Sequence, residues 1–285
     1  MARMDVAAIN PKSFGLGFRS KHFQDIQQDP RGVEWFEVLI ENFMGVPGLG
    51  QGYPLEQLKT LRSQFPLVFH GVSLGLGNTT EFNKDYLQIW TKLIAEFEPE
   101  WVSDHLCWNG VEHKNSHDLL PMPYTEEAAQ HISDRLDYIQ NLIKQPFVIE
   151  NVSNYIEYEN SEMNEWEFLN LICKKSGCKL LLDINNIYVN SFNHNFDAEN
   201  YLLSIAENNV QQIHLAGHHH EEDFIVDTHD ASVSDKVWEL YRQSLKHHGP
   251  KPTMIEWDDN IPEYKVLVEE LNKARKIQEQ THEFA

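Results

Sequence analysis

The sequence predicts a (β/α)8 TIM barrel that takes in residues 1–285 as a single domain. Eight short apolar runs recur along the chain, and stretches long enough for a helix separate them. Several of these stretches carry apolar residues at three- and four-residue spacing, such as Leu87, Trp90, Ile94 and Phe97. Repeated strand–helix alternation predicts parallel strands, and eight such strands close a barrel. A length of 285 residues suits one domain of this kind.

The predicted elements follow from the apolar pattern and its boundaries. Most of the runs are bounded by Gly, Pro or polar residues, which favours strands at 14–18, 33–40, 67–72, 101–106, 147–149, 180–184, 210–215 and 253–257. Amphipathic spacing predicts helices at 86–97, 125–143, 166–175, 198–206, 233–247 and 262–278. We expect residues 45–52 and 109–124 to be long loops over the barrel mouth.

The amino-acid composition argues against two classes of binding partner, nucleic acids and membranes. A formal net charge of −21 argues against a nucleic-acid surface, because phosphate binding needs a basic stripe that the sequence lacks. The amino-terminal residues lack the apolar core of a signal peptide, and no apolar run approaches the length of a membrane helix. We therefore expect a cytoplasmic protein without nucleic-acid or membrane partners. The three cysteines are too few for a disulfide framework.

Polar residues end nearly every predicted strand. Active sites of barrels lie at the carboxyl ends of the strands, so these residues are candidates for a common site. Following the runs in chain order, they are Arg19, Glu41, Asn42, His70, Asp104, His105, Glu150, Asn151, Asp183, Asn185, Asn186, His214, Glu256 and Asp258. One buried His or Glu alone would mean little, since barrel interiors often satisfy such groups by hydrogen bonds. Their recurrence around one ring is what indicates a site.

The stretch from 211 to 230 is the densest in metal-type ligands. It places His214 at the end of an apolar run and follows it with His218, Asp227 and His229. Asp227 and His229 are two residues apart, so in an extended chain both side chains lie on one face. The competing interpretation is a solvated His-rich loop with adventitious metal affinity.

These residue types predict a metal centre with more than one ion. Carboxylates and imidazoles without thiolates are typical ligands of Fe(II), Mn(II) or a catalytic zinc ion. Several crowded carboxylates would repel each other unless cations lay between them. Glu150, midway around the ring, is the natural bridge between two ions. We expect Asn42, Asp104 and Asn151 either to support the ligands from behind or to cap loops.

Six ordered motifs between residues 15 and 258 resemble a known family. They are FHGVSL (69–74), SDHLCW (103–108), ENVSNY (150–155), LLDINNIYVN (181–190), IHLAGH (213–218) and IEWD (255–258). They resemble the DUF692 or UPF0276 family, the multinuclear non-haem iron-dependent oxidative enzymes. The resemblance implies a TIM barrel that oxidises cysteine or another residue of a ribosomally synthesised precursor peptide, as in methanobactin biosynthesis. It also implies, in many members, a small partner protein that binds the leader peptide.

The resemblance further implies two or three iron ions, mixed-valence, with O2 as co-substrate. By motif, one iron would be held by His70, His105 and Glu150, and the next by Glu150, Asp183, His214 and Glu256. A third would be held by Asn186, Asp227 and His229, with His218 as a further ligand. Spacing alone does not choose between Asn185 and Asn186 or among the histidines from 218 to 220.

The leading hypothesis is therefore an iron-dependent, O2-dependent oxidase that modifies a precursor peptide. The alternative is a divalent-metal-dependent sugar isomerase, epimerase or hydrolase of the xylose-isomerase-like barrels, with zinc or manganese in place of iron. A DNA phosphodiesterase fits the ligand types but not the acidic charge. A non-catalytic metal-binding protein would not need ligands arranged around a pocket.

Overall fold

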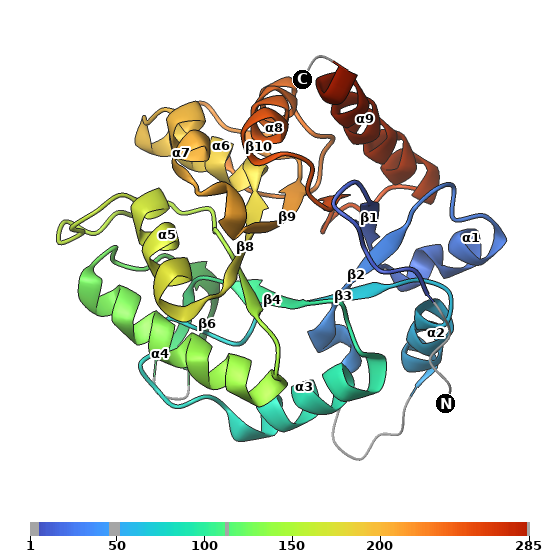
Figure 1. Cartoon of the computed structure of the whole chain (residues 1–285), viewed down its shortest axis with the longest axis horizontal. Helices are drawn as coiled ribbons and strands as arrows, with labels where there is room; N and C mark the ends of the chain where they lie inside the picture. The colour runs from blue at the N-terminus through green and yellow to red at the C-terminus, as the bar shows by residue number, and fades with distance from the viewer. Residues whose placement is uncertain (1–5, 46–51, 112–113, 284–285) are drawn as a thin grey trace.

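The computed structural model describes residues 6–45, 52–111 and 114–283. Eight parallel strands form a closed barrel in the order β1-β12-β9-β8-β7-β4-β3-β2, which is the inner ring in Figure 1. They are β1 (Phe14–Gly17), β2 (Trp35–Leu39), β3 (Leu67–Gly71), β4 (Val102–His105), β7 (Phe147–Glu150), β8 (Lys179–Asp183), β9 (Val210–Leu215) and β12 (Thr253–Ile255). Each strand overlaps one of the eight predicted runs, so the predicted TIM barrel is confirmed.

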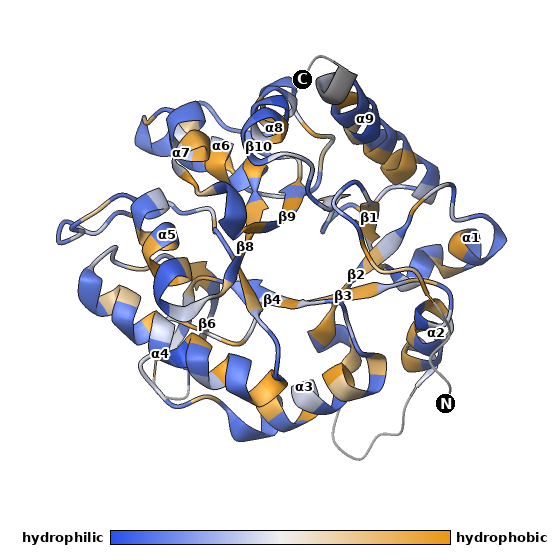
Figure 2. Cartoon of the chain, in the orientation of Figure 1, coloured by the Kyte–Doolittle hydropathy of each residue, from blue (hydrophilic) through white to orange (hydrophobic). Residues whose placement is uncertain are grey.

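Helices surround the barrel and turn their apolar sides towards it (Figure 2). They are α1 (Phe23–Gln28), α2 (Tyr53–Arg62), α3 (Lys84–Phe97), α4 (Glu126–Ile143), α5 (Glu165–Ser176), α6 (Ile184–His194), α7 (Ala198–Ser204), α8 (Asp235–His248) and α9 (Tyr264–Glu283). The six predicted helices are all present, but α1, α2 and α6 were not predicted. Helix α6 follows β8 without a loop, because the Asp183 side chain accepts a hydrogen bond from the Asn186 amide and caps the new helix.

The prediction of a loop at 109–124 is wrong for most of that stretch. Strands β5 (Trp108–Val111) and β6 (Lys114–Leu120) pair there as an antiparallel hairpin outside the barrel. Most of β6 is exposed, so its sequence lacks the apolar alternation that marks a half-buried strand. A second small sheet joins β10 (His219–His220) to β11 (Ile225–Val226). The other predicted loop, at 45–52, lies mostly outside the described residues.

The barrel interior has two layers. Side chains two residues apart on a strand share a face, so each strand contributes successive inward residues at a spacing of two. One layer, here called the apolar layer, is the buried cluster Trp35, Val68, Trp101, Val148, Leu181 and Met254. Two residues further along come Glu37, His70, Ser103, Glu150, Asp183 and Glu256, here called the polar layer. The carboxyl ends of the strands therefore hold a polar layer above an apolar one.

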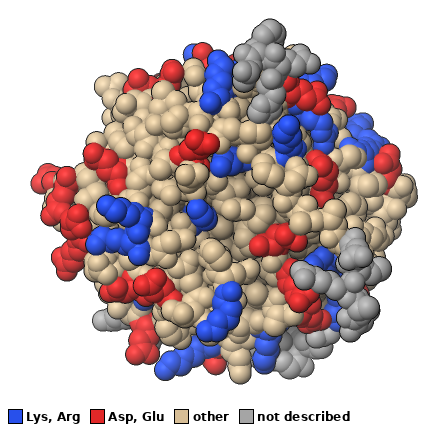
Figure 3. All heavy atoms as spheres, in the orientation of Figure 1, with Lys and Arg blue, Asp and Glu red and all other residues tan. Residues whose placement is uncertain are grey.

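The outer surface carries mixed charge. On the face shown in Figure 3, Lys and Arg side chains (blue) are interspersed with Asp and Glu side chains (red) and form no continuous basic area among the described residues. In the described ranges 6–45, 52–111 and 114–283, no helix is both long and apolar enough to span a lipid bilayer.

Candidate metal centre

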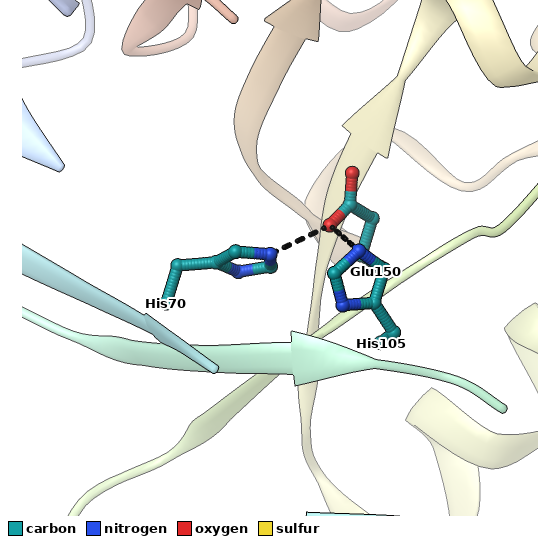
Figure 4. Close-up of side chains that lie close together, drawn as sticks. All are labelled: His70, His105 and Glu150. Carbon is teal, nitrogen blue, oxygen red and sulfur yellow. Dashed lines mark ion pairs between the residues drawn. The ribbon is translucent and has the colours of Figure 1, made fainter. Parts of the chain in front are cut away.

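The first group of candidate ligands comes from three neighbouring strands, β3, β4 and β7. The Nε2 atoms of His70 and His105 lie 3.2 Å and 3.3 Å from the same oxygen, Oε2 of Glu150 (Figure 4). The other nitrogen of each ring already has a partner. His70 Nδ1 is 2.8 Å from the Ser103 hydroxyl, and His105 Nδ1 is 3.2 Å from the Gly71 carbonyl oxygen. Both rings are therefore held with Nε2 facing Glu150.

The second group uses the other oxygen of Glu150. Its Oε1 lies 3.4 Å from Nδ1 of His214 on β9, and Oε2 of Glu256 lies 2.9 Å from the same nitrogen. Asp183 completes this group, whose ligand atoms all lie within 4.8 Å of one another. Glu150 thus presents one carboxylate oxygen to each group, which is the geometry of a bridging ligand. The structure brings together the same two residue sets that the motifs implied.

His229 lies between two sets of carboxylates beside the second group. Its Nδ1 is 3.2 Å from Glu256 Oε2 and 3.4 Å from Asp258 Oδ2, so these three residues form a further candidate group. Its Nε2 is 2.7 Å from Asp227 Oδ1. Asp258 also pairs with Arg19 at 2.5 Å. Sequence reasoning named Asp258 only as a strand-end residue, and its place at the end of the IEWD motif (255–258) gave no sign that it meets His229.

The structure separates the remaining candidates for the third set. Asn186 lines the cavity, and its Oδ1 is buried without a hydrogen-bond partner in the described part of the chain. Asn185 instead joins two other candidates, because it donates to Asp227 Oδ1 at 2.9 Å and faces His218 Nδ1 at 2.7 Å. His218 is therefore not among the residues that line the cavity.

Asn151, Asp104 and Asn42, the three residues expected to support the ligands, have different surroundings in the structure. Asn151 exchanges hydrogen bonds of 2.9 Å with both the amide and the carbonyl of Asp183, which ties the end of β7 to the end of β8. Asp104 is fully buried and accepts from the amides of His105 and Leu74 at 2.7 Å and 3.1 Å. Asn42 is exposed and lines the cavity from the turn after β2.

Sequence reasoning missed Glu37. This residue is in the middle of β2, buried, and its Oε2 is 3.1 Å from His214 Nε2. Gln212 on β9 donates to the same oxygen at 2.6 Å. Only residues at the ends of the apolar runs were predicted to belong to the site, whereas Glu37 lies inside a run. A charged residue within the apolar stretch WFEVL was the signal that could have found it.

Burial and crowding shift the pKa values of these groups in opposite directions. Burial disfavours the charged form of Glu150, but His105 and His214 outweigh it and hold the pKa of that carboxyl well below its usual range. Burial likewise opposes the charge of His70, but Glu150 outweighs it and raises the pKa of His70 to about 10. Burial lowers the pKa of His105 and raises that of Asp183 well above its usual range. Such a centre needs positive charge between its carboxylates.

Unpartnered buried atoms test whether metal ions fit here. Buried polar atoms nearly always have a hydrogen-bond partner. Within the described part of the chain, five buried polar atoms of the candidate centre have no hydrogen-bond partner: His70 Nε2, Glu150 Oε2, Asp183 Oδ2, Asn186 Oδ1 and His229 Nε2. Three of these five atoms have only an ion-pair contact, between His70 and Glu150 and between His229 and Asp227. All five are nitrogen or oxygen donors of the kind that bind iron, manganese or zinc. The donor set therefore fits more than one such ion, and a cavity of about 520 Å³ opens beside it.

Comparison with known proteins gives the family. Residues 13–279 match the family described as RiPP precursor modification enzyme MbnB/TglH/ChrH. A UPF0276 protein of Rhizorhabdus wittichii is 45% identical over 274 residues, which cover 95% of this chain and 97% of that protein. A UPF0276 protein of Caulobacter vibrioides is 44% identical over 263 residues, which cover 92% of each chain.

Solved structures of other proteins share the barrel. The 3-keto-D-glucoside 4-epimerase from E. coli has a TM-score of 0.60 at 13% identity, covering 93% of this chain and 99% of that one. Endonuclease IV from Thermus thermophilus has a TM-score of 0.57 at 14% identity, covering 96% and 100%. At such low identity these likenesses show the fold alone. The family match and the curated relatives go further: this chain belongs to the MbnB/TglH/ChrH family of RiPP precursor modification enzymes.

Proposed function

We propose that this enzyme is a multinuclear non-haem iron, O2-dependent oxidase that modifies a cysteine of a ribosomally synthesised precursor peptide. Membership of a precursor-modification family supports the peptide substrate. The observation that carries the metal proposal is Glu150, which presents Oε2 to two histidines and Oε1 to a third. A carboxylate placed in this way suits a pair of ions a few ångströms apart, which is the arrangement needed for joint chemistry on one substrate.

The ligand assignment follows from the groups in the structure. His70, His105 and Glu150 would hold the first ion, and Glu150, Asp183, His214 and Glu256 the second. For a third ion, two features favour the Nε2 side of His229: Asn186 Oδ1 has no hydrogen-bond partner, and the Asp227 carboxylate lies beside His229 Nε2. The Nδ1 side, with Glu256 and Asp258, is the competing position.

When bound, iron would supply O2 activation and a coordination position that lowers the pKa of a substrate thiol. The protein would supply the cavity and its orientation. Leu119 and Val152 give the lining apolar surface, while Arg19 and Asn42 add polar groups near the mouth. This mixture suits one side chain of a peptide that enters from solvent. A small leader-binding partner, a cytoplasmic location and a single domain over all 285 residues belong to the same proposal.

The sugar isomerase, epimerase or hydrolase alternative, with zinc or manganese, has less support. Epimerases are among the solved structures with this fold, but at 11–13% identity they show no shared chemistry. The family match concerns modification of a peptide precursor.

The first test is metal analysis of protein purified without oxygen from iron-supplied cells. We expect two to three irons per chain and antiferromagnetic coupling in the Mössbauer spectrum. The loaded protein is then mixed with candidate precursor peptides, and O2 uptake and peptide mass are recorded, with a Cys→Ser peptide as the control. A single zinc or manganese ion with no coupled iron would overturn the iron proposal. Equal modification of the Ser peptide would overturn the cysteine assignment.

The third position is tested by two matched variants. Asp227→Asn is expected to remove one ion per chain, because it weakens the Nε2 side of His229, while Asp258→Asn leaves the count unchanged. The reverse result would place the ion with Glu256 and Asp258. Loss of every ion in Asp227→Asn would contradict a separable third site.

A further inference from the structure

His214 differs from the other two imidazoles of the paired groups in what lies behind it. The outer nitrogens of His70 and His105 face neutral oxygens, the Ser103 hydroxyl and the Gly71 carbonyl. The outer nitrogen of His214, Nε2, faces a carboxylate oxygen of Glu37 at 3.1 Å. Both side chains are buried, His214 at 0% and Glu37 at 4% exposure, so solvent does not screen this contact.

A neighbouring tryptophan fixes the orientation of the amide beside His214. Trp101 Nε1 donates at 2.6 Å to Gln212 Oε1, and an indole N–H can only donate. The Gln212 amide is therefore turned with its oxygen towards Trp101 and its NH2 group towards Glu37, 2.6 Å away, and His214. The amide nitrogen of Gln212 can only donate, so whenever His214 Nε2 carries a proton, Glu37 is its acceptor.

Metal binding through Nδ1 would set the tautomer of His214. His214 Nδ1 faces Glu150 and Glu256, so a metal ion in the second group would need the lone pair on this nitrogen. A neutral imidazole that binds through Nδ1 carries its proton on Nε2. That proton points at Glu37. The arrangement is a carboxylate–histidine pair directed at a metal position, which raises the donor strength of the imidazole.

We propose that Glu37 is a positioning residue that strengthens electron donation by the second group, which already has three carboxylates where the first group has one. The histidines of the first group, backed by neutral oxygens, donate less. The second group then favours the more highly charged ion of an unequal pair, and the first group keeps the ion of lower charge. This proposal rests on the proposed metal pair. It adds which of the two positions carries the higher charge and names Glu37 as a residue that increases the difference between them.

The contact depends on barrel closure. Glu37 is on β2 and His214 is on β9, and β1 and β12 lie between these strands in the barrel order. The two residues are 177 positions apart in the chain. Glu37 thus reaches His214 across the interior, above the apolar layer. An isosteric change at Glu37 tests the charge without opening a cavity in that packing.

The test compares Glu37→Gln with the wild type and with Ser103→Ala, which removes the neutral partner of His70. Metal-free protein is titrated with Fe(II) under anaerobic conditions, and the midpoint potential of the loaded pair is measured. For Glu37→Gln we expect one of the two paired ions to bind about 10–100-fold more weakly. We also expect a higher midpoint potential, because removal of the anionic partner destabilises the oxidised ion. Ser103→Ala is expected to weaken the other ion and to move the potential less.

Glu37→Asp keeps the charge on a shorter side chain and is expected to restore part of the potential shift; circular dichroism checks that each variant is folded. Dissociation constants and a potential equal to those of the wild type in Glu37→Gln would overturn the role of Glu37. Failure of the wild type itself to bind two ions would instead overturn the proposed metal pair, so the two failures are distinguishable.

Discussion

The two layers of the barrel interior are built from the same strands but contain opposite chemistry. The apolar layer holds residues such as Trp35 and Leu181, and the polar layer, two positions further along, holds Glu37 and Asp183. Burial of an apolar side chain stabilises the fold by about 1.5–3 kcal/mol. Burial of an unpaired charge costs several kcal/mol. The polar layer therefore opposes folding unless cations or protons compensate it, which is typical of a site kept for chemistry.

The contrast between the apolar and polar layers is weakest at β9. There Gln212 occupies the position that an apolar residue fills on most other strands. Gln212 joins Trp101 of the apolar layer to Glu37 of the polar layer through hydrogen bonds of 2.6 Å. The two layers thus differ in composition but are linked by these hydrogen bonds. Substitutions in the polar layer should mainly alter metal binding, and substitutions in the apolar layer should mainly alter the stability of the fold.

The largest effect is expected from Glu150→Gln in the polar layer. Loss of the bridging carboxylate charge weakens both groups at once, so the protein should lose two ions per chain while its far-UV circular dichroism stays the same. Metal analysis after gel filtration measures the loss, with the exposed Glu159→Gln as the matched control. Retention of both ions would show that Glu150 does not bridge them.

Leu181→Ala in the apolar layer should show the opposite pattern. Leu181 is fully buried, and truncation of such a side chain costs about 2–5 kcal/mol of unfolding free energy. The comparison is with Leu142→Ala, a change at an exposed position of α4 that should stay within about 0.5 kcal/mol. Urea unfolding gives both values. Loss of the bound ions in Leu181→Ala with little change in unfolding free energy would contradict the assignment of stability to the apolar layer and metal binding to the polar layer.

A smaller, pH-dependent effect is expected at Glu165, a buried carboxyl outside the metal centre. Burial raises its pKa from 4.5 to about 8, against smaller opposing effects of Tyr201 and Asn190. The folded state therefore keeps a proton that the unfolded state releases. The contribution of protonated Glu165 is complete below about pH 4.5 and is lost as the pH rises through about 8.

Glu165→Gln is neutral at every pH, so its stability relative to the wild type should rise between pH 5 and 8, by on the order of 2 kcal/mol. Denaturant unfolding at several pH values measures this difference, and Glu159→Gln is again the control. Parallel stability profiles for Glu165→Gln and the wild type would show that a lone buried carboxyl here behaves no differently from an exposed one. That result would weaken the contrast with Glu150, whose pKa neighbouring histidines lower.

The sequence by itself determined the barrel, the family and the two main groups of candidate ligands. Strand positions follow from short apolar runs, because burial of a parallel strand on both faces leaves a continuous apolar stretch. Residues such as His70 and Glu150 could be found because they end those runs, and parallel strands bring their carboxyl ends together. The helix α6 was missed because its start, capped by Asp183, leaves no loop to mark the end of β8.

Tertiary structure decided which neighbours meet. Asn186 rather than Asn185 has its oxygen unpartnered beside the cavity, because the first turn of α6 sends adjacent side chains in different directions. Asp258 meets His229 only because the chain after β12 passes beside the loop after β11. Glu37 meets His214 only because the barrel closes. Distances between residues far apart in the chain depend on packing, and local spacing does not encode them.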